Sequence, residues 1–269
     1  MFGLALPDML MVFLTTSYAI VAFHAVNVGR IASMYRTLWA SHRLRYLQLN
    51  IAQLVAWIGG FLIPIYFSPS SLLVSGMSVT SLCGCMSIYA TSRRRSALVN
   101  AVLLALNLLL FYLLYLDVYR GWTYVVFCVS TLSVGLAMFA ILRLSSDMQT
   151  GGLTSTQILA ARTWLLWMIP LMYVIVDRQF ASITPAVLRD TAVLGLMSLI
   201  LPLYFLQRSI ASLGPDKTGI LIGFTPMVIV GFELVFLKSV QVPDVVGAVI
   251  LPVIIVGFAL YERSAQRRA

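Results

Sequence analysis

The residues most able to do chemistry in this sequence are polar side chains set within long apolar stretches. Asn50, Gln53 and Trp57 follow one another at spacings of three and four residues, so a helix would carry them on one face. Such a face could line a polar cavity, with the indole as a stacking wall, or its amides could lie among lipid headgroups. Asn107 sits within another apolar stretch, where its amide needs a partner, either a bound molecule or a neighbouring helix.

One acid is also embedded in apolar sequence. Glu233 lies in the run Val230–Phe236, where it could face a cavity and bind a proton or cation, or lie at the membrane interface near Lys238. Thr225 stands beside Pro226, which removes a backbone hydrogen bond from its helix and bends it. Together these features predict a substrate-binding site made of Gln53, Trp57, Asn107, Thr225 and Glu233.

No enzyme motif accompanies these residues. The sequence has no nucleotide-binding loop, no Gly-x-Ser-x-Gly and no His-Glu-x-x-His, and its two histidines, His24 and His42, are far apart. The three cysteines lie in apolar stretches without metal-site spacing, which is typical of small packing residues. We therefore expect no catalytic residues, no metal and no cofactor.

The amino-acid composition indicates which kind of structure holds these polar side chains in place. Hydrophobic residues make up 61% of the 269 residues and charged residues only 10%, against about 25% charged in an average soluble domain. Too little charge remains to cover a water-facing surface. The chain is therefore expected to be a single all-α polytopic membrane domain over residues 1–269, with the lipid bilayer as its outer solvent.

About 20 apolar residues are needed to cross the hydrocarbon core as a helix. By that measure the sequence predicts about nine transmembrane helices, at 5–28, 46–67, 71–91, 97–117, 122–143, 157–177, 188–208, 218–237 and 243–262.

The distribution of basic residues predicts the orientation of these spans. Fourteen of the 18 Lys and Arg residues fall in alternate polar segments and the tail, when Arg162 is counted with the loop before it, and four fall in the others. Basic residues concentrate on the cytoplasmic side of membranes, which also accounts for the net charge of +9 without nucleic acid as a partner. We expect the N-terminus outside and the C-terminus in the cytoplasm, in a bacterial inner membrane.

Small residues mark one span as central. Gly76, Thr80 and Gly84 recur every four residues, a spacing that lets a neighbouring helix backbone approach closely. We expect the helix over 71–91 to be buried among other helices rather than exposed to lipid.

The last third of the chain resembles the final three helices of EamA-type transporters in the drug/metabolite transporter superfamily. The resemblance covers about residues 195–262 and rests on Leu213-Gly214, on Pro226 and on Gly247-Ala248. It differs at Leu237-Lys238, where the family commonly has Gly-Glu. The resemblance implies two inverted halves around a central cavity. The family usually has ten helices, so nine would correspond to a first half that lacks one helix, with halves at 1–117 and 122–262.

Two functions follow as expectations. The first is a transporter that moves a small metabolite or a lipid-linked molecule across the membrane by alternating access, without an ATPase of its own. The alternative is a non-transporting membrane subunit of a larger sensor, secretion or polysaccharide-export assembly. The expected partners are the substrate and the bilayer, with a second copy of the chain or a membrane partner subunit as a further possibility.

Overall fold

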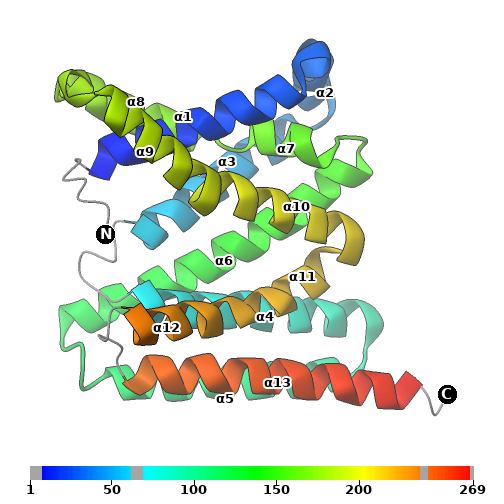
Figure 1. Ribbon diagram of the computed structural model, residues 1–269. Coiled ribbons are helices and arrows are strands. Elements are labelled where there is room, and N and C mark those ends of the chain that lie inside the picture. Colours follow the sequence, from blue (N-terminus) through cyan, green and yellow to red (C-terminus); the bar gives the residue numbers. More distant parts are fainter. Residues whose placement is uncertain (1–7, 62–68, 237–241, 267–269) are drawn as a thin grey trace. The chain divides into compact units, whose positions relative to one another are not determined.

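The computed structural model describes residues 8–61, 69–236 and 242–266 (Figure 1). Every regular element in these ranges is helical, and no strand occurs among them. The described residues contain eight helices that are long and apolar enough to cross a membrane. The prediction of an all-α polytopic membrane protein is confirmed. In chain order the α-helices are α1 (Asp8–Val26), α2 (Ile31–Ser41), α3 (Arg43–Phe61), α4 (Pro69–Ser92), α5 (Arg95–Tyr115), α6 (Trp122–Thr150), α7 (Ser155–Ala161), α8 (Trp164–Val176), α9 (Pro185–Gly195), α10 (Leu201–Leu213), α11 (Pro215–Leu221), α12 (Thr225–Phe236) and α13 (Val242–Gln266).

The remaining expected span, 46–67, begins within α3, and residues 62–67 lie outside the described ranges. Three of the eight spans consist of two helices each: α7 with α8, α9 with α10, and α11 with α12. A short π-helical turn at Leu196–Ile200 joins α9 to α10.

The chain divides into two compact units. Unit 1 comprises Met1–Leu54 and Leu144–Ser212, and unit 2 comprises Val55–Arg143 and Leu213–Ala269. Each unit combines segments from both of the halves expected from the sequence, so packing does not follow the order of the chain.

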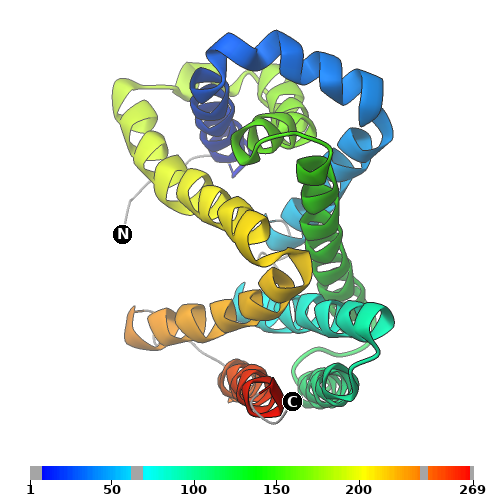
Figure 2. The same cartoon turned by 90° about the vertical axis from the view of Figure 1, so that its right-hand side faces the viewer.

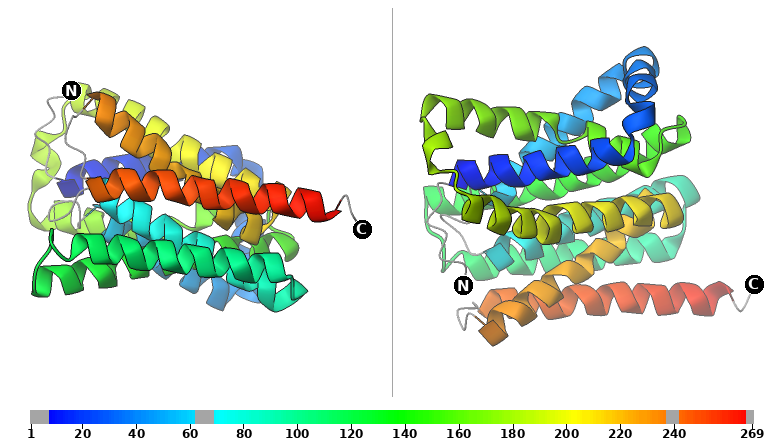
Figure 3. Two further views of the ribbon diagram at one scale, coloured as in Figure 1. Left: turned by 90° about the horizontal axis from the view of Figure 1, so that it is seen from below. Right: turned by 45° about the horizontal axis from the view of Figure 1, so that its top comes forward.

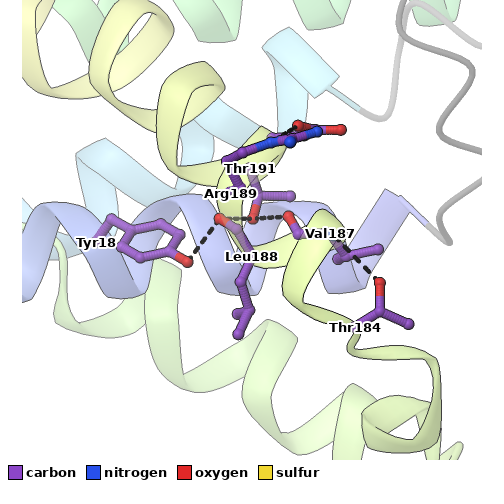
Figure 4. Close-up of polar contacts among 7 residues, drawn as sticks. Tyr18, Thr184, Val187, Leu188, Arg189 and Thr191 are labelled. Atoms are coloured by element: carbon purple, nitrogen blue, oxygen red, sulfur yellow. Dashed lines mark hydrogen bonds and ion pairs between the residues drawn. The ribbon is translucent and has the colours of Figure 1, made fainter.

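In unit 1, α1 lies between α8 and α9 (Figure 3). The hydroxyl of Tyr18 on α1 donates a hydrogen bond to the carbonyl oxygen of Leu188 on α9, at 2.9 Å (Figure 4). The side chain of Thr184 caps α9 by accepting from the backbone N–H of Val187 at 3.3 Å, which satisfies one of the donors left free at a helix start.

A hydrogen-bonded aromatic cluster joins α1, α2 and α8. His24 Nδ1 donates to the carbonyl oxygen of Ile20 at 2.8 Å, so in the neutral ring Nε2 accepts from the hydroxyl of Tyr35 at 2.9 Å. The indole N–H of Trp164 donates to the same hydroxyl at 2.6 Å. Burial raises the pKa of Tyr35 above its ordinary value, so the hydroxyl remains protonated. The cluster fixes α2 against the start of α8.

In unit 2, α5 and α13 lie side by side, and α4 packs on them together with the span α11–α12 (Figure 2). The α4 span is the most buried of the eight. The hydroxyl of Thr80 on α4 donates to the carbonyl oxygen of Gly135 on α6 at 3.0 Å. A Cβ at Gly135 would overlap the side chain of Val79. The prediction that this span is central and closely packed is confirmed.

The same helix packs closely on α11. A Cβ at Gly84 would come within 2.9 Å of the carbonyl oxygen of Asp216. The hydroxyl of Ser81 donates to the carbonyl oxygen of Gly219 at 3.1 Å. The carboxylate of Asp216 pairs with Arg143 at 2.9 Å. Small residues therefore let α4 contact both of these neighbours at backbone distance.

Three pairs of helices far apart in sequence pack most extensively within the units: α1 with α8, α4 with α11, and α5 with α13. When α3 is counted as the second span, the spans can be numbered one to nine along the chain. The two helices of each pair then belong to spans whose numbers differ by five, as the first and the sixth do.

Candidate functional site

The span Ser155–Val176 is interrupted where α7 ends and α8 begins, at Arg162 and Thr163. In an unbroken helix the backbone N–H of Leu165 would donate to the carbonyl oxygen of Ala161, four residues earlier. Here the side-chain amide of Asn50 lies between these two groups. Its Nδ2 donates to the carbonyl oxygen of Ala161 at 3.0 Å, and its Oδ1 accepts from the N–H of Leu165 at 3.3 Å. A side chain inserted into the backbone ladder is an established cause of a sharp helix break.

The break is tolerated because the side chain of Asn50 satisfies two of its backbone groups within the protein. Asn50 is only 2% exposed, and irregular backbone at membrane depth occurs only where it is buried in protein or lines a cavity. At the other end of α7, Thr154 and Gln157 form a capping box, which stabilises the N-terminus of this seven-residue helix. Asn50 therefore lies within the protein interior and not among lipid headgroups.

Arg162, at the break, is the most unusual side chain of unit 1. It is 1% exposed, and its Nη1 donates to Oε1 of Gln207 on α10 at 3.4 Å. Its Nε has no hydrogen-bond partner among the described residues, and neither has Nε2 of Gln207, which is fully buried. Within the described ranges, no carboxylate forms an ion pair with Arg162. Placing an arginine within a membrane span costs about 2.5–3.5 kcal/mol on insertion scales, so an unpaired one requires an explanation.

Arg162 falls in the first turns of the expected span 157–177, although the charge count grouped it with the loop before that span. It is the eighth residue of the span Ser155–Val176, so it lies roughly 10 Å from that end at about 1.5 Å per residue. The sequence did not predict that Arg162 is buried, because a single arginine near a helix start is usually an interfacial anchor. Without Arg162, thirteen basic residues remain in the basic set of segments against four.

Two more buried side chains close to Asn50 and Arg162 carry polar atoms that have no partner among the described residues. Gln53 lies one turn beyond Asn50 on α3, is 3% exposed, and its Oε1 accepts no hydrogen bond. The hydroxyl of Thr163, next to Arg162, is fully buried and also unpaired. Three donors, on Arg162, Gln207 and Thr163, are thus left without acceptors around one helix break.

The other four predicted site residues belong to unit 2. Asn107 on α5 is buried and its Nδ2 has no partner. Trp57 and Thr225 are partly buried. Glu233 is 7% exposed, and no described residue donates to or pairs with its carboxylate; Lys238 lies outside the described ranges. No hydrogen bond given for the described residues joins any two of these four, so their grouping into one site stays a prediction.

A buried acid that sequence reasoning assigned no role lies near the start of α13. Asp244 is fully buried, and its carboxylate accepts from the hydroxyl of Ser70 at 3.0 Å and from the hydroxyl of Tyr115. Ser70 belongs to the start of α4 and Tyr115 to the end of α5, so the carboxylate ties three helix ends together. Its place in the first turn of a long helix was the available signal, since acids are favoured there.

Neither chemical clusters nor known proteins assign a role to these residues. In the part of the chain that the structure describes, no three His, Cys, Asp or Glu side chains gather as a metal site would require. No model of a known protein family matches the chain, and no curated protein matches it. The function has to be argued from the chain's own geometry.

Proposed function

We propose that this integral membrane protein is a secondary transporter, which moves a small metabolite or lipid-linked molecule by alternating access. The observation that carries the proposal is the broken helix α7–α8, held open by Asn50 and carrying the buried Arg162. In secondary transporters, discontinuous helices place backbone and side-chain groups at the substrate site.

The internal packing of the helices supports this proposal. Each of the pairs α1 and α8, α4 and α11, and α5 and α13 is separated by five positions in the order of spans. A bundle made of two five-helix repeats would pair equivalent helices in this way when they meet across a pseudo-two-fold axis. In such a scheme the equivalent of α6 would be the first helix of the ten usual in EamA-type transporters, the helix that a nine-helix version of that fold would lack.

The energy source and setting follow from the sequence. The chain has no nucleotide-binding motif, so an ion gradient, exchange or downhill flow would drive the movement. We propose a bacterial inner membrane as its location, with the N-terminus outside and the C-terminus in the cytoplasm, the orientation that the distribution of basic residues favours. No enzymatic activity is proposed.

Alternating access can be tested without knowing the substrate. The three free cysteines, Cys83, Cys85 and Cys128, are replaced by alanine, and a single cysteine is introduced at Thr163. A membrane-impermeant maleimide is then applied to intact spheroplasts and to inverted vesicles. A transporter is expected to expose the helix break to each side in turn, so Thr163→Cys should be labelled in both preparations.

Two matched cysteines calibrate this measurement. Val102 on α5 is an exposed apolar residue within a span, so Val102→Cys should remain unlabelled in lipid. Arg120 is an exposed residue of the connection between α5 and α6, so Arg120→Cys should be labelled from one side. Labelling of Thr163→Cys from one side only, or from neither, would contradict alternating access and favour the non-transporting subunit.

A further inference from the structure

Three polar side chains at the break of α7–α8 share one property: each has a donor without an acceptor among the described residues. Arg162 brings a full positive charge and an unpaired Nε–H, Gln207 brings an unpaired Nε2 amide, and Thr163 brings an unpaired hydroxyl. All three side chains are at least nine-tenths buried. The nearest acceptor in the pair itself, Oε1 of Gln207, receives a single long hydrogen bond of 3.4 Å from Arg162.

We infer that Arg162 and Gln207, together with Thr163, bind an anionic group of the transported molecule, a carboxylate or a phosphate. The guanidinium is the side chain best suited to planar, two-point recognition of either oxyanion. An oxyanion also has enough lone pairs to accept from the Gln207 amide and the Thr163 hydroxyl at the same time. This inference rests on the proposed function, because it names the substrate class of that same site.

The backbone on the α8 side of the break has the same sign of charge. Arg162 and Thr163 directly precede α8, a helix of 13 residues, whose dipole places partial positive charge at its start. A negative group bound there would interact favourably with the dipole as well as with the guanidinium. Within the described residues no carboxylate already neutralises this position.

A structural role and a binding role for Arg162 predict different changes in the melting temperature when the residue is replaced. A structural arginine stabilises the empty protein, so removing it lowers the melting temperature. A binding arginine is an unpaired buried charge in the empty protein, and its replacement by an apolar residue of similar size is often neutral or stabilising. The sign of the change in melting temperature therefore separates the two roles.

The experiment uses the purified full chain in detergent, titrated with acetate and with inorganic phosphate at constant pH and ionic strength. Acetamide, the neutral analogue of acetate, is the control ligand. We expect acetate, phosphate or both to raise the melting temperature of the wild type saturably, and acetamide to leave it unchanged. The two anions distinguish a carboxylate substrate from a phosphate substrate.

Three variants complete the test. Arg162→Met should lose the saturable rise and should melt no lower than the wild type without anions. Gln207→Glu, which offers Arg162 an internal carboxylate of nearly the same shape, should raise the melting temperature without anions and weaken anion binding at least about 30-fold. Arg189→Gln alters an exposed arginine of the same unit and should respond to anions as the wild type does.

The results decide the two proposals separately. The anion site is overturned if the wild type gives no saturable rise, if Arg162→Met responds equally, or if both Arg162→Met and Gln207→Glu lower the melting temperature without anions. General effects of phosphate on protein hydration would act on all variants alike. Anion binding without two-sided labelling of Thr163→Cys would leave a binding site in a protein that does not transport. Labelling without anion binding would leave a transporter of another substrate class.

Discussion

Asn50 replaces a backbone hydrogen bond between two residues more than 100 positions away, because its amide lies between the carbonyl oxygen of Ala161 and the N–H of Leu165. One side chain on α3 thus holds the break in α7–α8.

Replacing Asn50 should therefore destabilise unit 1. Asn50→Leu removes one donor and one acceptor and leaves two backbone groups buried without partners, which should lower the free energy of unfolding by about 1–3 kcal/mol. Asn100→Leu is the matched control, because that similarly buried amide donates at 3.5 Å to the sulfur of Cys85, a weak acceptor, rather than to a broken helix backbone. Thermal unfolding in detergent measures both. An equal loss in the two variants would show that Asn50 has no special part at the break.

Replacing Thr80 should loosen the contact between α4 and α6. Thr80→Leu adds bulk where the Thr80 hydroxyl reaches the carbonyl oxygen of Gly135, and overpacking of a close interface costs about 1–3 kcal/mol. Thr80→Ser keeps the hydroxyl and should cost less. An unchanged melting temperature in Thr80→Leu would mean that the interface between α4 and α6 accommodates the larger side chain without loss of stability.

The carboxylate of Glu233 should matter for coupling rather than for stability. Glu233→Gln keeps the shape of the side chain and removes its ionisable group, so uptake of a labelled anion into proteoliposomes should stop or lose its pH dependence. Expression and melting temperature should stay near wild type, since no described residue pairs with the carboxylate. Full uptake with the wild-type pH profile would remove Glu233 from the mechanism.

The hydrogen bond between Tyr115 and Asp244 should give a measurable coupling energy. Tyr115→Phe and Asp244→Asn should each destabilise unit 2, and the double variant should lose less than the sum of the two. A double-mutant cycle on residues in contact is expected to give a coupling of about 0.5–3 kcal/mol. Strict additivity would show that the two side chains act independently.

The two ends of the chain should lie on opposite sides of the membrane. Reporter tags fused before Met1 and after Ala269 should show the first outside and the second in the cytoplasm, because the basic residues alternate between segments. Two cytoplasmic tags would mean that the chain crosses the membrane an even number of times.

Local sequence predicted those features that depend on neighbouring residues. Apolar runs of about 20 residues predicted the spans, because the thickness of the hydrocarbon core fixes their length. The spacing of Gly76, Thr80 and Gly84 predicted the burial of α4, because small residues on one helix face act together. Neither kind of pattern extends beyond a single helix.

The break at Arg162 depends on contacts that no local pattern contains. Asn50 and Ala161 are 111 positions apart, and Arg162 and Gln207 are 45 apart. The sequence identified the polar face of Asn50 and Gln53 but not its neighbour, and it placed Arg162 in the first turns of a span without predicting its burial. The role of Asp244 was missed for the same reason, since its hydroxyl partners lie on α4 and α5.

The absence of a side chain at Gly135 limits how unit 2 can move. A Cβ there would overlap Val79 and lie 2.5 Å from the carbonyl oxygen of Gly76, so α4 and α6 interlock at a single register. A slide or a rotation of one helix along the other would push a neighbouring side chain into that gap. The helices α4 and α6 should therefore keep their relative position during any conformational cycle. Bending of helix axes should be confined to interrupted helices such as α7–α8.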